Sequence, residues 1–347
     1  MATIKDIAKK MNLGVSTVSM ALNNNPRISQ ATRQEVMRVA NEMGYVKNWL
    51  AADLQGGRNN LILVIVDDAS RPYFSRFIDI VQNRIAYHGF DLLISTTFNN
   101  HLDTAKRYLS QNRGAGAIVF TMQIDDDFIN KCANDEFPIY VFGREVVGNE
   151  NVYCQKEVSY YLSGYLSTNY LIEQGFKRIA YVRQVLSTLG TPRRFEGYLK
   201  ALAENNIAFD EGLVFDVNRD NGKNIYDNGY MVTEEIIKNI QDKKIDAVFY
   251  SNDSLALGGL KCFSDAAVKV PEDISVIGYG DLPYSRFLSP TLSTVGSPDY
   301  ASVYNYGVDT LVKAINNEDT SSVDEDYREL LLNAREIVYE RGSVRRK

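Results

Sequence analysis

The sequence is poor in the side chains that form disulfides, metal sites and histidine-based catalytic centres. It contains three cysteines, Cys132, Cys154 and Cys262, and two histidines, His88 and His101. The cysteines are far apart and show no C-x-x-C spacing, which argues against a disulfide framework or a zinc site. We therefore expect no bound metal and no cofactor.

The sequence also lacks long apolar runs and the common catalytic signatures. No window approaches the roughly 20 apolar residues that span a bilayer, and polar residues interrupt positions 1–13 too often for a secretion signal. Glycine-rich nucleotide loops and the G-x-S-x-G nucleophile motif are absent. These absences predict a cytoplasmic protein that does not contact a membrane and is not an enzyme.

The charge of the chain is unevenly distributed. The 347 residues carry a net charge of −6, but residues 1–58 hold eight basic and four acidic side chains. The first 58 residues therefore carry +4 and the remainder −10. A basic N-terminal part attached to an acidic body suggests that only the N-terminal part meets a polyanion. At 45% hydrophobic residues, the chain is long enough for two or three globular units.

Residues 1–46 have the pattern of three short helices. Thr3 and Asp6 form a capping box at the start of the first helix, and Ser29 caps the third, which Gly44 ends. A break at residues 12–14 separates the first two helices, as in a helix-turn-helix unit. At helical spacing, the apolar residues predicted to face one small core are Ile4, Ile7, Ala8, Met11, Val15, Val18, Ala21, Leu22, Val36, Val39, Ala40 and Met43.

Four stretches of this part resemble the DNA-binding head of the lactose/galactose repressor (LacI/GalR) family. They are TIKDIA at 3–8, STVSMALN at 16–23, ISQATR at 28–33 and GYVKN at 44–48. The resemblance implies a helix-turn-helix domain at residues 1–46 and a hinge helix at 47–58. It places Val15, Ser16 and Met20 at the positions that read base edges in the major groove. Methionine replaces the usual family arginine at position 20.

The family likeness also implies contacts to the DNA backbone and to the minor groove. In the family, the leucine that corresponds to Leu54 enters the minor groove at the operator centre. The residues expected to contact DNA are Thr3, Lys5, Val15, Ser16, Thr17, Ser19, Met20, Asn23, Ser29, Thr32, Arg33, Tyr45, Asn48, Ala51 and Leu54.

After residue 60 the pattern becomes an alternation of strands and helices. Apolar runs at 61–66, 117–120, 179–182, 247–250 and 274–277 are separated by helical stretches such as 77–88 and 158–173. Runs that are apolar on both faces predict parallel sheets covered by helices. The similar stretches at 89–93 and 175–180 suggest two related subdomains.

Further motifs extend the resemblance to the end of the chain. They are RFEGY at 194–198, SNDSLALG at 251–258, VPEDISVIG at 270–278, PTLSTV at 290–295 and RGS at 341–343. The resemblance implies a two-lobe α/β domain like periplasmic binding proteins, with two doubly wound parallel sheets, at 59–347. This domain would bind the effector and dimerise. We expect a first lobe at about 59–158 and 286–318, and a second at about 159–285 and 319–347.

The family fold places a ligand between the lobes. Arg194 is the foremost candidate, because the family arginine there donates to ligand hydroxyl or carboxylate groups. Gly280 replaces an aspartate of many relatives, and Ser159 with Tyr160 replaces a frequent Asp-Asn pair. The residues expected to bind the effector are Asp68, Ser70, Tyr73, Phe74, Arg144, Arg194, Asn252 and Asp281.

The sequence thus predicts a transcriptional repressor of carbohydrate genes, associated with the bacterial nucleoid. It would act as a homodimer on double-stranded, pseudo-palindromic operator DNA, under the control of a sugar or sugar phosphate. Two alternatives stay open. One is a global regulator controlled by a phosphoprotein partner, and the other is a corepressor-dependent repressor of the purine type.

Overall fold

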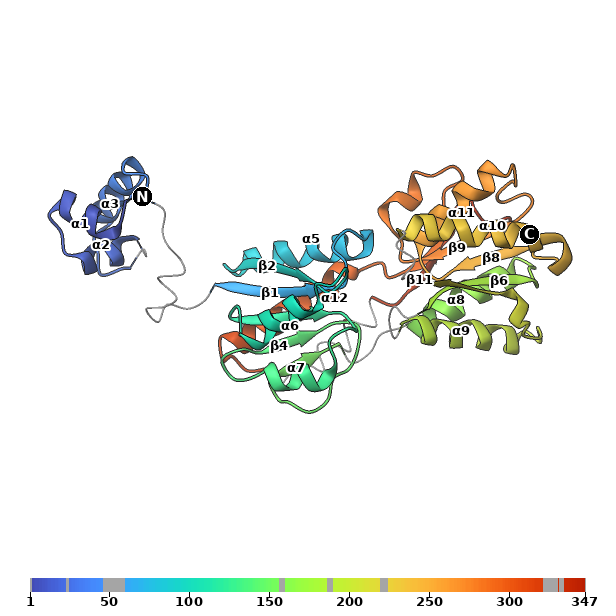
Figure 1. Cartoon of the computed structure of the whole chain (residues 1–347), viewed down its shortest axis with the longest axis horizontal. Coiled ribbons are helices and arrows are strands. Elements are labelled where there is room, and N and C mark those ends of the chain that lie inside the picture. The colour runs from blue at the N-terminus through green and yellow to red at the C-terminus, as the bar shows by residue number, and fades with distance from the viewer. Residues whose placement is uncertain are drawn as a thin grey trace. The chain divides into compact units, whose positions relative to one another are not determined.

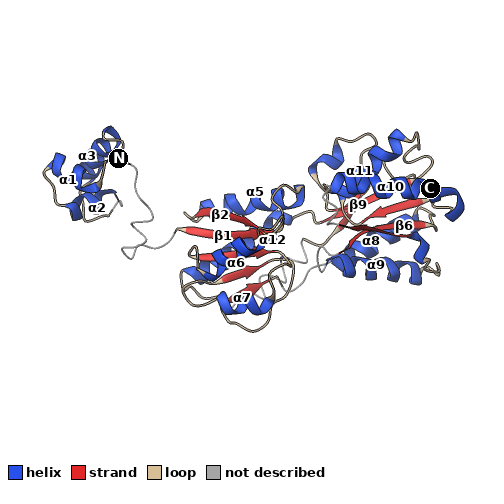
Figure 2. Cartoon of the chain, in the orientation of Figure 1, coloured by secondary structure: helices blue, strands red, loops and turns tan. Residues whose placement is uncertain are grey.

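The structure is a computed structural model that describes residues 2–22, 25–45, 60–155, 160–185, 190–218, 224–320, 330 and 334–346. The chain divides into two compact units, Met1–Asn59 and Asn60–Lys347 (Figure 1). The first unit is helical, and the second contains two sheets, each flanked by helices (Figure 2). Each unit is described by itself below.

The N-terminal unit contains α1 (Ile4–Met11), α2 (Val15–Leu22) and α3 (Gln30–Glu42). The predicted capping box of α1 is present, because the Asp6 amide donates to the Thr3 hydroxyl and Asp6 accepts from the Thr3 amide at 2.8 Å. Ser29 caps α3 by accepting from the Thr32 amide at 3.2 Å. Gly44 has the expected left-handed conformation, with φ +62°. These local contacts fix where the helices begin and end.

The core of this unit is small and formed by all three helices. Its buried residues are Ile7, Ala8, Val18, Ala21, Val36, Val39 and Ala40. Most residues of the predicted apolar faces belong to this cluster or pack against it. Val15 is the exception, since 43% of its surface is exposed. Because Val15 is the first residue of α2, its side chain lies beyond the contact with α1 and α3 and is open to solvent.

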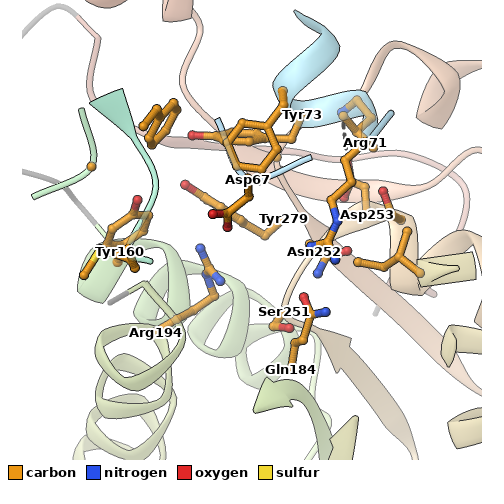
Figure 3. A pocket seen from close by; sticks show the side chains of 18 of the residues that line it. Asp67, Arg71, Tyr73, Tyr160, Gln184, Arg194, Ser251, Asn252, Asp253 and Tyr279 are labelled. Atoms are coloured by element: carbon orange, nitrogen blue, oxygen red, sulfur yellow. Dashed lines mark hydrogen bonds between the residues drawn. The ribbon is translucent and has the colours of Figure 1, made fainter. Parts of the chain in front are cut away.

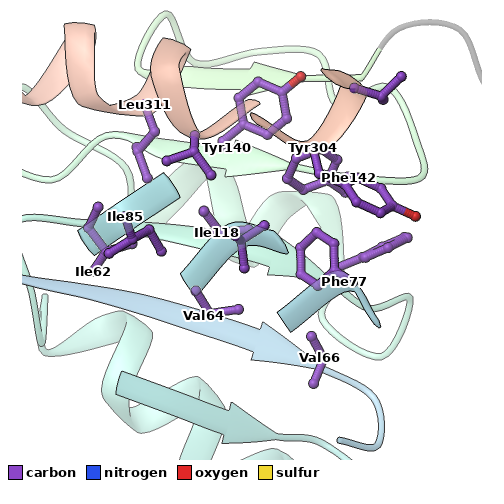
Figure 4. Packing of buried hydrophobic residues seen from close by; sticks show 14 of the residues in the cluster. Ile62, Val64, Val66, Phe77, Ile85, Ile118, Tyr140, Phe142, Tyr304 and Leu311 are labelled. Atoms are coloured by element: carbon purple, nitrogen blue, oxygen red, sulfur yellow. The ribbon is translucent and has the colours of Figure 1, made fainter. Parts of the chain in front are cut away.

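The first lobe of the body has a five-stranded parallel sheet in the order β2-β1-β3-β4-β5. Alternate residues of β1 face opposite cores, as a strand buried on both sides requires. Ile62, Val64 and Val66 face α5 and α12 (Figure 4), and Leu63 and Ile65 face α6 and α7. The elements are β1 (Leu61–Val66), α5 (Pro72–Tyr87), β2 (Asp91–Thr96), α6 (Leu102–Ser110), β3 (Gly116–Phe120), α7 (Asp126–Cys132), β4 (Ile139–Val141), β5 (Val152–Cys154) and α12 (Tyr300–Ile315).

The second lobe has a six-stranded sheet in the order β11-β10-β9-β8-β6-β7. Helices α10 and α11 cover one face, and α8 and α9 cover the other. The elements are α8 (Tyr160–Glu173), β6 (Ile179–Val185), α9 (Gly190–Glu204), η1 (Glu211–Leu213), β7 (Val214–Asn218), α10 (Ile225–Lys243), β8 (Ala247–Tyr250), α11 (Asp253–Asp265), β9 (Ser275–Tyr279), η2 (Pro283–Arg286), β10 (Ser293–Gly296) and β11 (Ile337–Tyr339).

Three details differ from the sequence predictions. β10 pairs with β9 in the second sheet, so the predicted return of the chain to the first lobe near residue 286 is one strand too early. β11 runs antiparallel to β10, so one edge of the second sheet is not parallel. α5 begins at Pro72 rather than at residue 77, because proline suits the first position of a helix. Tyr73 and Phe74 therefore lie in the first turn of α5.

Candidate functional site

A pocket in the body lies where the strands of both sheets end. Asp67 follows β1, Thr121 follows β3, Ser251 follows β8 and Gly280 follows β9, while Gln184 lies near the end of β6. The carboxyl ends of parallel strands are where open α/β sheets bind ligands. The pocket is lined by Asp67, Arg71, Tyr73, Phe74, Phe120, Thr121, Met122, Phe142, Gly143, Tyr160, Gln184, Arg194, Ile225, Ser251, Asn252, Asp253, Ser254, Tyr279, Gly280 and Leu282 (Figure 3).

The first lobe contributes a wall of aromatic rings. Tyr73, Phe74 and Phe120 meet edge to face, with ring centroids 5.5 to 5.7 Å apart. Phe77 lies behind them, and its ring centroid is 4.9 Å from that of Phe120. Edge-to-face packing fixes each ring against its neighbours. The wall therefore gives this side of the pocket a defined, apolar shape.

Asp67 is the carboxylate of this wall, and two threonines of the first lobe donate hydrogen bonds to it. It is 2% exposed, and its Oδ1 accepts from the hydroxyls of Thr97, at 3.2 Å, and Thr121. Hydrogen bonds of this kind offset the cost of burying a carboxylate. The two threonine hydroxyls therefore fix the Asp67 carboxylate at the pocket, where it can accept hydrogen bonds.

Arg194 is the main charged group that the second lobe presents to the pocket. Its guanidinium carbon lies 3.9 Å from the ring centre of Tyr279 and 5.6 Å from that of Tyr160. Its Nε donates to the Ser163 hydroxyl at 3.1 Å, and the residue is only 6% exposed. An arginine stays charged when buried. The pocket therefore contains a buried cation whose described hydrogen-bond and ring partners are neutral, with the carboxylate of Glu336 as a charged neighbour.

The close packing of α8 against α9 holds Arg194 in this position. A Cβ atom on Gly164 would lie 1.9 Å from the Arg194 carbonyl oxygen, and one on Gly197 would lie 2.1 Å from the Tyr161 carbonyl oxygen. Only glycine allows the two backbones to approach so closely. The glycine of the RFEGY stretch is thus explained by helix packing.

Burial raises the pKa of the tyrosines around Arg194. The pKa of Tyr279 lies well above its ordinary value, chiefly because burial disfavours the phenolate. Its hydroxyl stays protonated and donates to Glu336 Oε1 at 2.9 Å. Burial likewise raises the pKa of Tyr160. Both rings therefore present neutral faces to the guanidinium, as cation–π contacts require.

Asp253 lines the pocket and stabilises the second lobe through hydrogen bonds. Its carboxylate is fully buried and accepts from the Leu282 amide at 2.8 Å, from Ser285 at 3.0 Å and from Thr294 at 2.6 Å. Burial raises its pKa to about 6, although these three donors act in the opposite direction. Asp253 therefore ties α11, η2 and β10 together.

Four of the predicted effector residues line the pocket: Tyr73, Phe74, Arg194 and Asn252. Asn252 also caps α11, since its Oδ1 accepts from the Leu255 amide at 2.9 Å. Both the binding interpretation and the capping interpretation of Asn252 thus fit the structure.

The other four predicted effector residues lie outside the lining, because each has protein partners that hold it elsewhere. Asp68 accepts from the Ser70 hydroxyl at 2.6 Å and faces Arg71 at 3.4 Å. Arg144 is buried, pairs with Asp126 at 2.8 Å and donates to the Thr121 and Ile124 carbonyls. Asp281 is bound by Arg341 and Arg286.

Sequence reasoning missed several lining residues, among them Asp67, Tyr160, Gln184 and Ser251. Asp67, Gln184 and Ser251 come within two residues of the end of a predicted apolar run. That position was a usable signal, because parallel strands end at a common edge. For Tyr160, the sequence shows only a departure from the family pattern.

One side chain crosses from the first lobe to the second beside the pocket. Arg76 on α5 donates to the carbonyl oxygens of Gly280 at 3.0 Å and Asp281 at 3.1 Å. Its guanidinium carbon also lies 4.2 Å from the ring centre of Tyr300. Arg76 therefore connects the two lobes through the loop that follows β9.

None of the predicted DNA contacts on the described part of the N-terminal unit is buried. They lie at helix ends or on α2, and they are Thr3, Lys5, Val15, Ser16, Thr17, Ser19, Met20, Ser29, Thr32, Arg33 and Tyr45. The predicted contacts Asn23, Asn48, Ala51 and Leu54, and the whole predicted hinge helix at 47–58, lie outside the described residues.

Two other kinds of site are absent from the described part of the chain. Residues of the types that hold metal ions do not gather in groups of three or more there. Among the helices described, none has both the length and the apolar character needed to cross a bilayer.

Comparison with known proteins identified two matching families. Residues 3–48 match the family described as bacterial regulatory proteins, lacI family, and residues 168–335 match the periplasmic binding protein-like domain. The HTH-type transcriptional repressor PurR of Histophilus somni is 32% identical over 302 residues, which cover 85% of this chain and 87% of PurR.

A second relative and a solved structure extend the likeness. The HTH-type transcriptional regulator GalR of Escherichia coli is 32% identical over 302 residues, covering 86% of this chain and 85% of GalR. The crystal structure of the lac repressor dimer, bound to operator and the anti-inducer ONPF, superimposes with a TM-score of 0.76. It is 21% identical and covers 99% of this chain and 98% of its own.

Proposed function

The chain belongs to the lacI family of bacterial regulatory proteins and is a DNA-binding transcriptional repressor, and we propose that a small sugar or sugar phosphate in the pocket controls it. The target genes would be those of carbohydrate use. The periplasmic binding protein-like fold of the body is the scaffold for this ligand.

The observation that carries the proposal is the buried guanidinium of Arg194. Its described hydrogen-bond partner is the neutral hydroxyl of Ser163, and its flat face lies on Tyr279. Burial of a cation is costly unless acceptors surround it. Sugar hydroxyls and phosphate oxygens are such acceptors, and a planar fork can bind two of them at once.

The opposite wall suits the rest of a sugar. Tyr73, Phe74 and Phe120 offer apolar ring faces and edges, and Asp67 and Asn252 offer oxygen acceptors. A pocket with many apolar side chains and a few placed polar groups is the usual form of a small-molecule site. A sugar ring has both an apolar face and polar hydroxyls, and so it complements the two kinds of wall.

The ligand would act by changing the balance between two arrangements of the lobes. It can shift that balance only as far as its affinities for the two arrangements differ. The lobes would then move the two hinge segments of a homodimer relative to each other on a pseudo-palindromic operator.

Arg194→Ala tests the pocket. We expect the variant to bind operator DNA but to lose the effector response, which a DNA-binding titration with and without sugars would measure. A full response in this variant would remove Arg194 from the proposal.

Leu54→Ala tests the DNA contact. We expect specific operator binding to weaken much more than binding to random DNA, because the Leu54 side chain would enter the minor groove only at the operator centre. Equal losses on both DNAs in a mobility-shift assay would contradict the assignment.

A purine-type corepressor is the second candidate. It is favoured by the relative named PurR and by the flat aromatic rings of the first wall. Purine bases and sugars tested side by side for stabilisation of the full chain separate the two, because a bound ligand raises the melting temperature.

A further inference from the structure

We propose that Gln184 and Ser251 act with Arg194 to bind an oxyanion, so that the effector carries a carboxylate or a phosphate group. The inference rests on the proposed function, because it specifies which chemical group of the small molecule the second lobe recognises. It assigns a binding role to two residues, Gln184 and Ser251, that the sequence analysis did not select.

Gln184 and Ser251 are buried beside the pocket with hydrogen-bonding capacity left over. Gln184 is 4% exposed and Ser251 is 1% exposed. Among the described residues, the side-chain nitrogen of Gln184 and the hydroxyl oxygen of Ser251 have no hydrogen-bond partner. Buried polar groups in native proteins are nearly always paired. Two unpaired groups on one pocket wall therefore indicate a ligand that pairs them.

The three side chains come together from neighbouring elements. β6 and β8 run parallel, with Val182 opposite Tyr250, and the Ser251 amide donates to the Val182 carbonyl at 2.9 Å. This pairing places Ser251 next to the end of β6, where Gln184 lies. Arg194 comes from the beginning of α9. Figure 3 shows Arg194, Ser251 and Gln184 on the same side of the pocket, across from Asp67 and Tyr73.

The charges around the pocket favour an anion at this wall. Arg194 forms no ion pair with any carboxylate in the described part of the chain. The two acidic groups of the lining are already occupied, since Asp67 accepts from two threonines and Asp253 from three donors. The nearby acid Glu336 accepts from Tyr279 instead. Glu336 interacts electrostatically with Arg194 but forms no ion pair with it in the described residues, so the terminal N–H groups of the guanidinium are left for the ligand.

The donor types also match an oxyanion better than a neutral ring. The guanidinium offers a planar pair of N–H groups, the Gln184 amide adds a third N–H, and the Ser251 hydroxyl adds an O–H. Carboxylates and phosphates have several lone pairs on closely spaced oxygens, and charge-assisted hydrogen bonds are stronger than neutral ones. A neutral sugar hydroxyl would accept fewer of these bonds and would leave the charge of Arg194 unpaired.

The first experiment uses the smallest oxyanions as probes. Melting temperatures of the full chain are measured in inorganic phosphate, acetate and chloride at equal ionic strength. We expect phosphate or acetate to stabilise the wild-type protein beyond chloride, because only a ligand of the folded state raises the melting temperature. Gln184→Leu and Ser251→Ala should lose most of this difference. Equal melting temperatures in all three salts would overturn the proposal.

Two surface substitutions serve as matched controls. Gln241→Leu and Ser264→Ala make the same chemical changes on exposed parts of α10 and α11. They should keep the full anion-dependent stabilisation. If the controls lost the stabilisation as the pocket variants do, the effect would not belong to the pocket and the proposal would fail.

The second experiment compares pairs of sugars in which one member carries an anionic group at C6. Titration calorimetry of the full chain is made with glucose and glucose 6-phosphate, and with galactose and galacturonate. If either sugar of a pair binds, we expect the anionic sugar to bind at least about tenfold more tightly than the neutral one. Gln184→Leu should weaken binding of the anionic sugar about tenfold. The affinity of the neutral member should change little.

The outcomes separate this inference from the proposed function. If the neutral and anionic sugars bound equally well and Gln184→Leu changed neither affinity, the oxyanion assignment would be overturned. The proposal of a sugar-controlled repressor would then still stand. A purine base that binds while all sugars fail would overturn the proposed effector class together with the inference.

Discussion

The two walls of the pocket differ in their side chains: one is mainly aromatic, and the other is mainly polar. The first-lobe wall consists of interlocked rings, and its carboxylate, Asp67, already has hydrogen-bond partners within its own lobe. The second-lobe wall holds Arg194, Gln184 and Ser251, whose hydrogen-bonding capacity is not used up by the described residues. The comparison indicates that one lobe defines the shape of the ligand site and the other its polar recognition. Four predictions test this division.

The largest expected effect is a loss of stability in the first lobe. Phe77→Ala removes a fully buried ring whose centroid lies 4.9 to 5.2 Å from those of Phe120, Phe142 and Tyr304. We expect the free energy of unfolding to fall by about 3–5 kcal/mol, because a cavity remains where the ring was. Urea denaturation measures the change. The control Phe209→Ala, at a ring that is 47% exposed, should cost much less.

The second prediction concerns pH and Asp253. Burial raises its pKa to about 6, so the folded protein holds a proton that the unfolded chain releases above the ordinary value of 3.8. Stability from this group is thus greatest at low pH and is lost as the pH rises through about 6. Relative to Asp253→Asn, we expect the wild type to gain up to about 3 kcal/mol between pH 7 and pH 4.

Unfolding titrations of both proteins across this pH range measure the difference for Asp253. Asp242→Asn is the control, because that side chain is exposed and the same substitution there should leave the pH dependence unchanged. A wild-type protein that loses stability relative to Asp253→Asn on acidification would show that the sign is wrong.

The third prediction concerns the connection between the walls. Arg76→Met removes two hydrogen bonds to the Gly280 and Asp281 carbonyls in the other lobe. We expect a loss of about 1–3 kcal/mol, and a more open body in small-angle scattering. The matched control Arg84→Met breaks an ion pair with Asp309 inside the first lobe and should not open the body. Identical scattering from the two variants would contradict a lobe-connecting role for Arg76.

The smallest expected effect is the most informative about the second wall. Arg194→Met removes a buried charge but keeps much of the side-chain volume. We expect the unfolding free energy of the ligand-free protein to change by no more than about 1 kcal/mol, because the lost contacts are offset by the relief of burying a charge. A large loss in thermal or urea unfolding would show that Arg194 stabilises the fold rather than serving the ligand.

The sequence predicted the N-terminal helices well because their signals are local. Thr3 with Asp6, Ser29 and Gly44 act within one helical turn of their own positions, so three or four neighbouring residues contain the whole interaction. Val15 departed from its predicted core position because its exposure depends on where the other two helices pack.

The candidate site was predicted only in part. Tyr73, Phe74, Arg194 and Asn252 line the pocket, since each lies shortly after a strand or in a family motif. Asp68, Ser70, Arg144 and Asp281 looked equally suitable in the sequence. Their partners include residues such as Arg341, which is far away in the chain, and no local pattern indicates such a contact.

By itself, the sequence determined the class of the protein: three short helices, two of them with clear caps, a basic N-terminal part, and strands alternating with helices. These properties follow from spacing, capping and charge, which a linear chain records. Only the tertiary structure decided which polar groups are paired and which face the pocket, and in which sheet β10 lies. Pairing and burial depend on distances between residues far apart in the chain, and folding alone sets those distances.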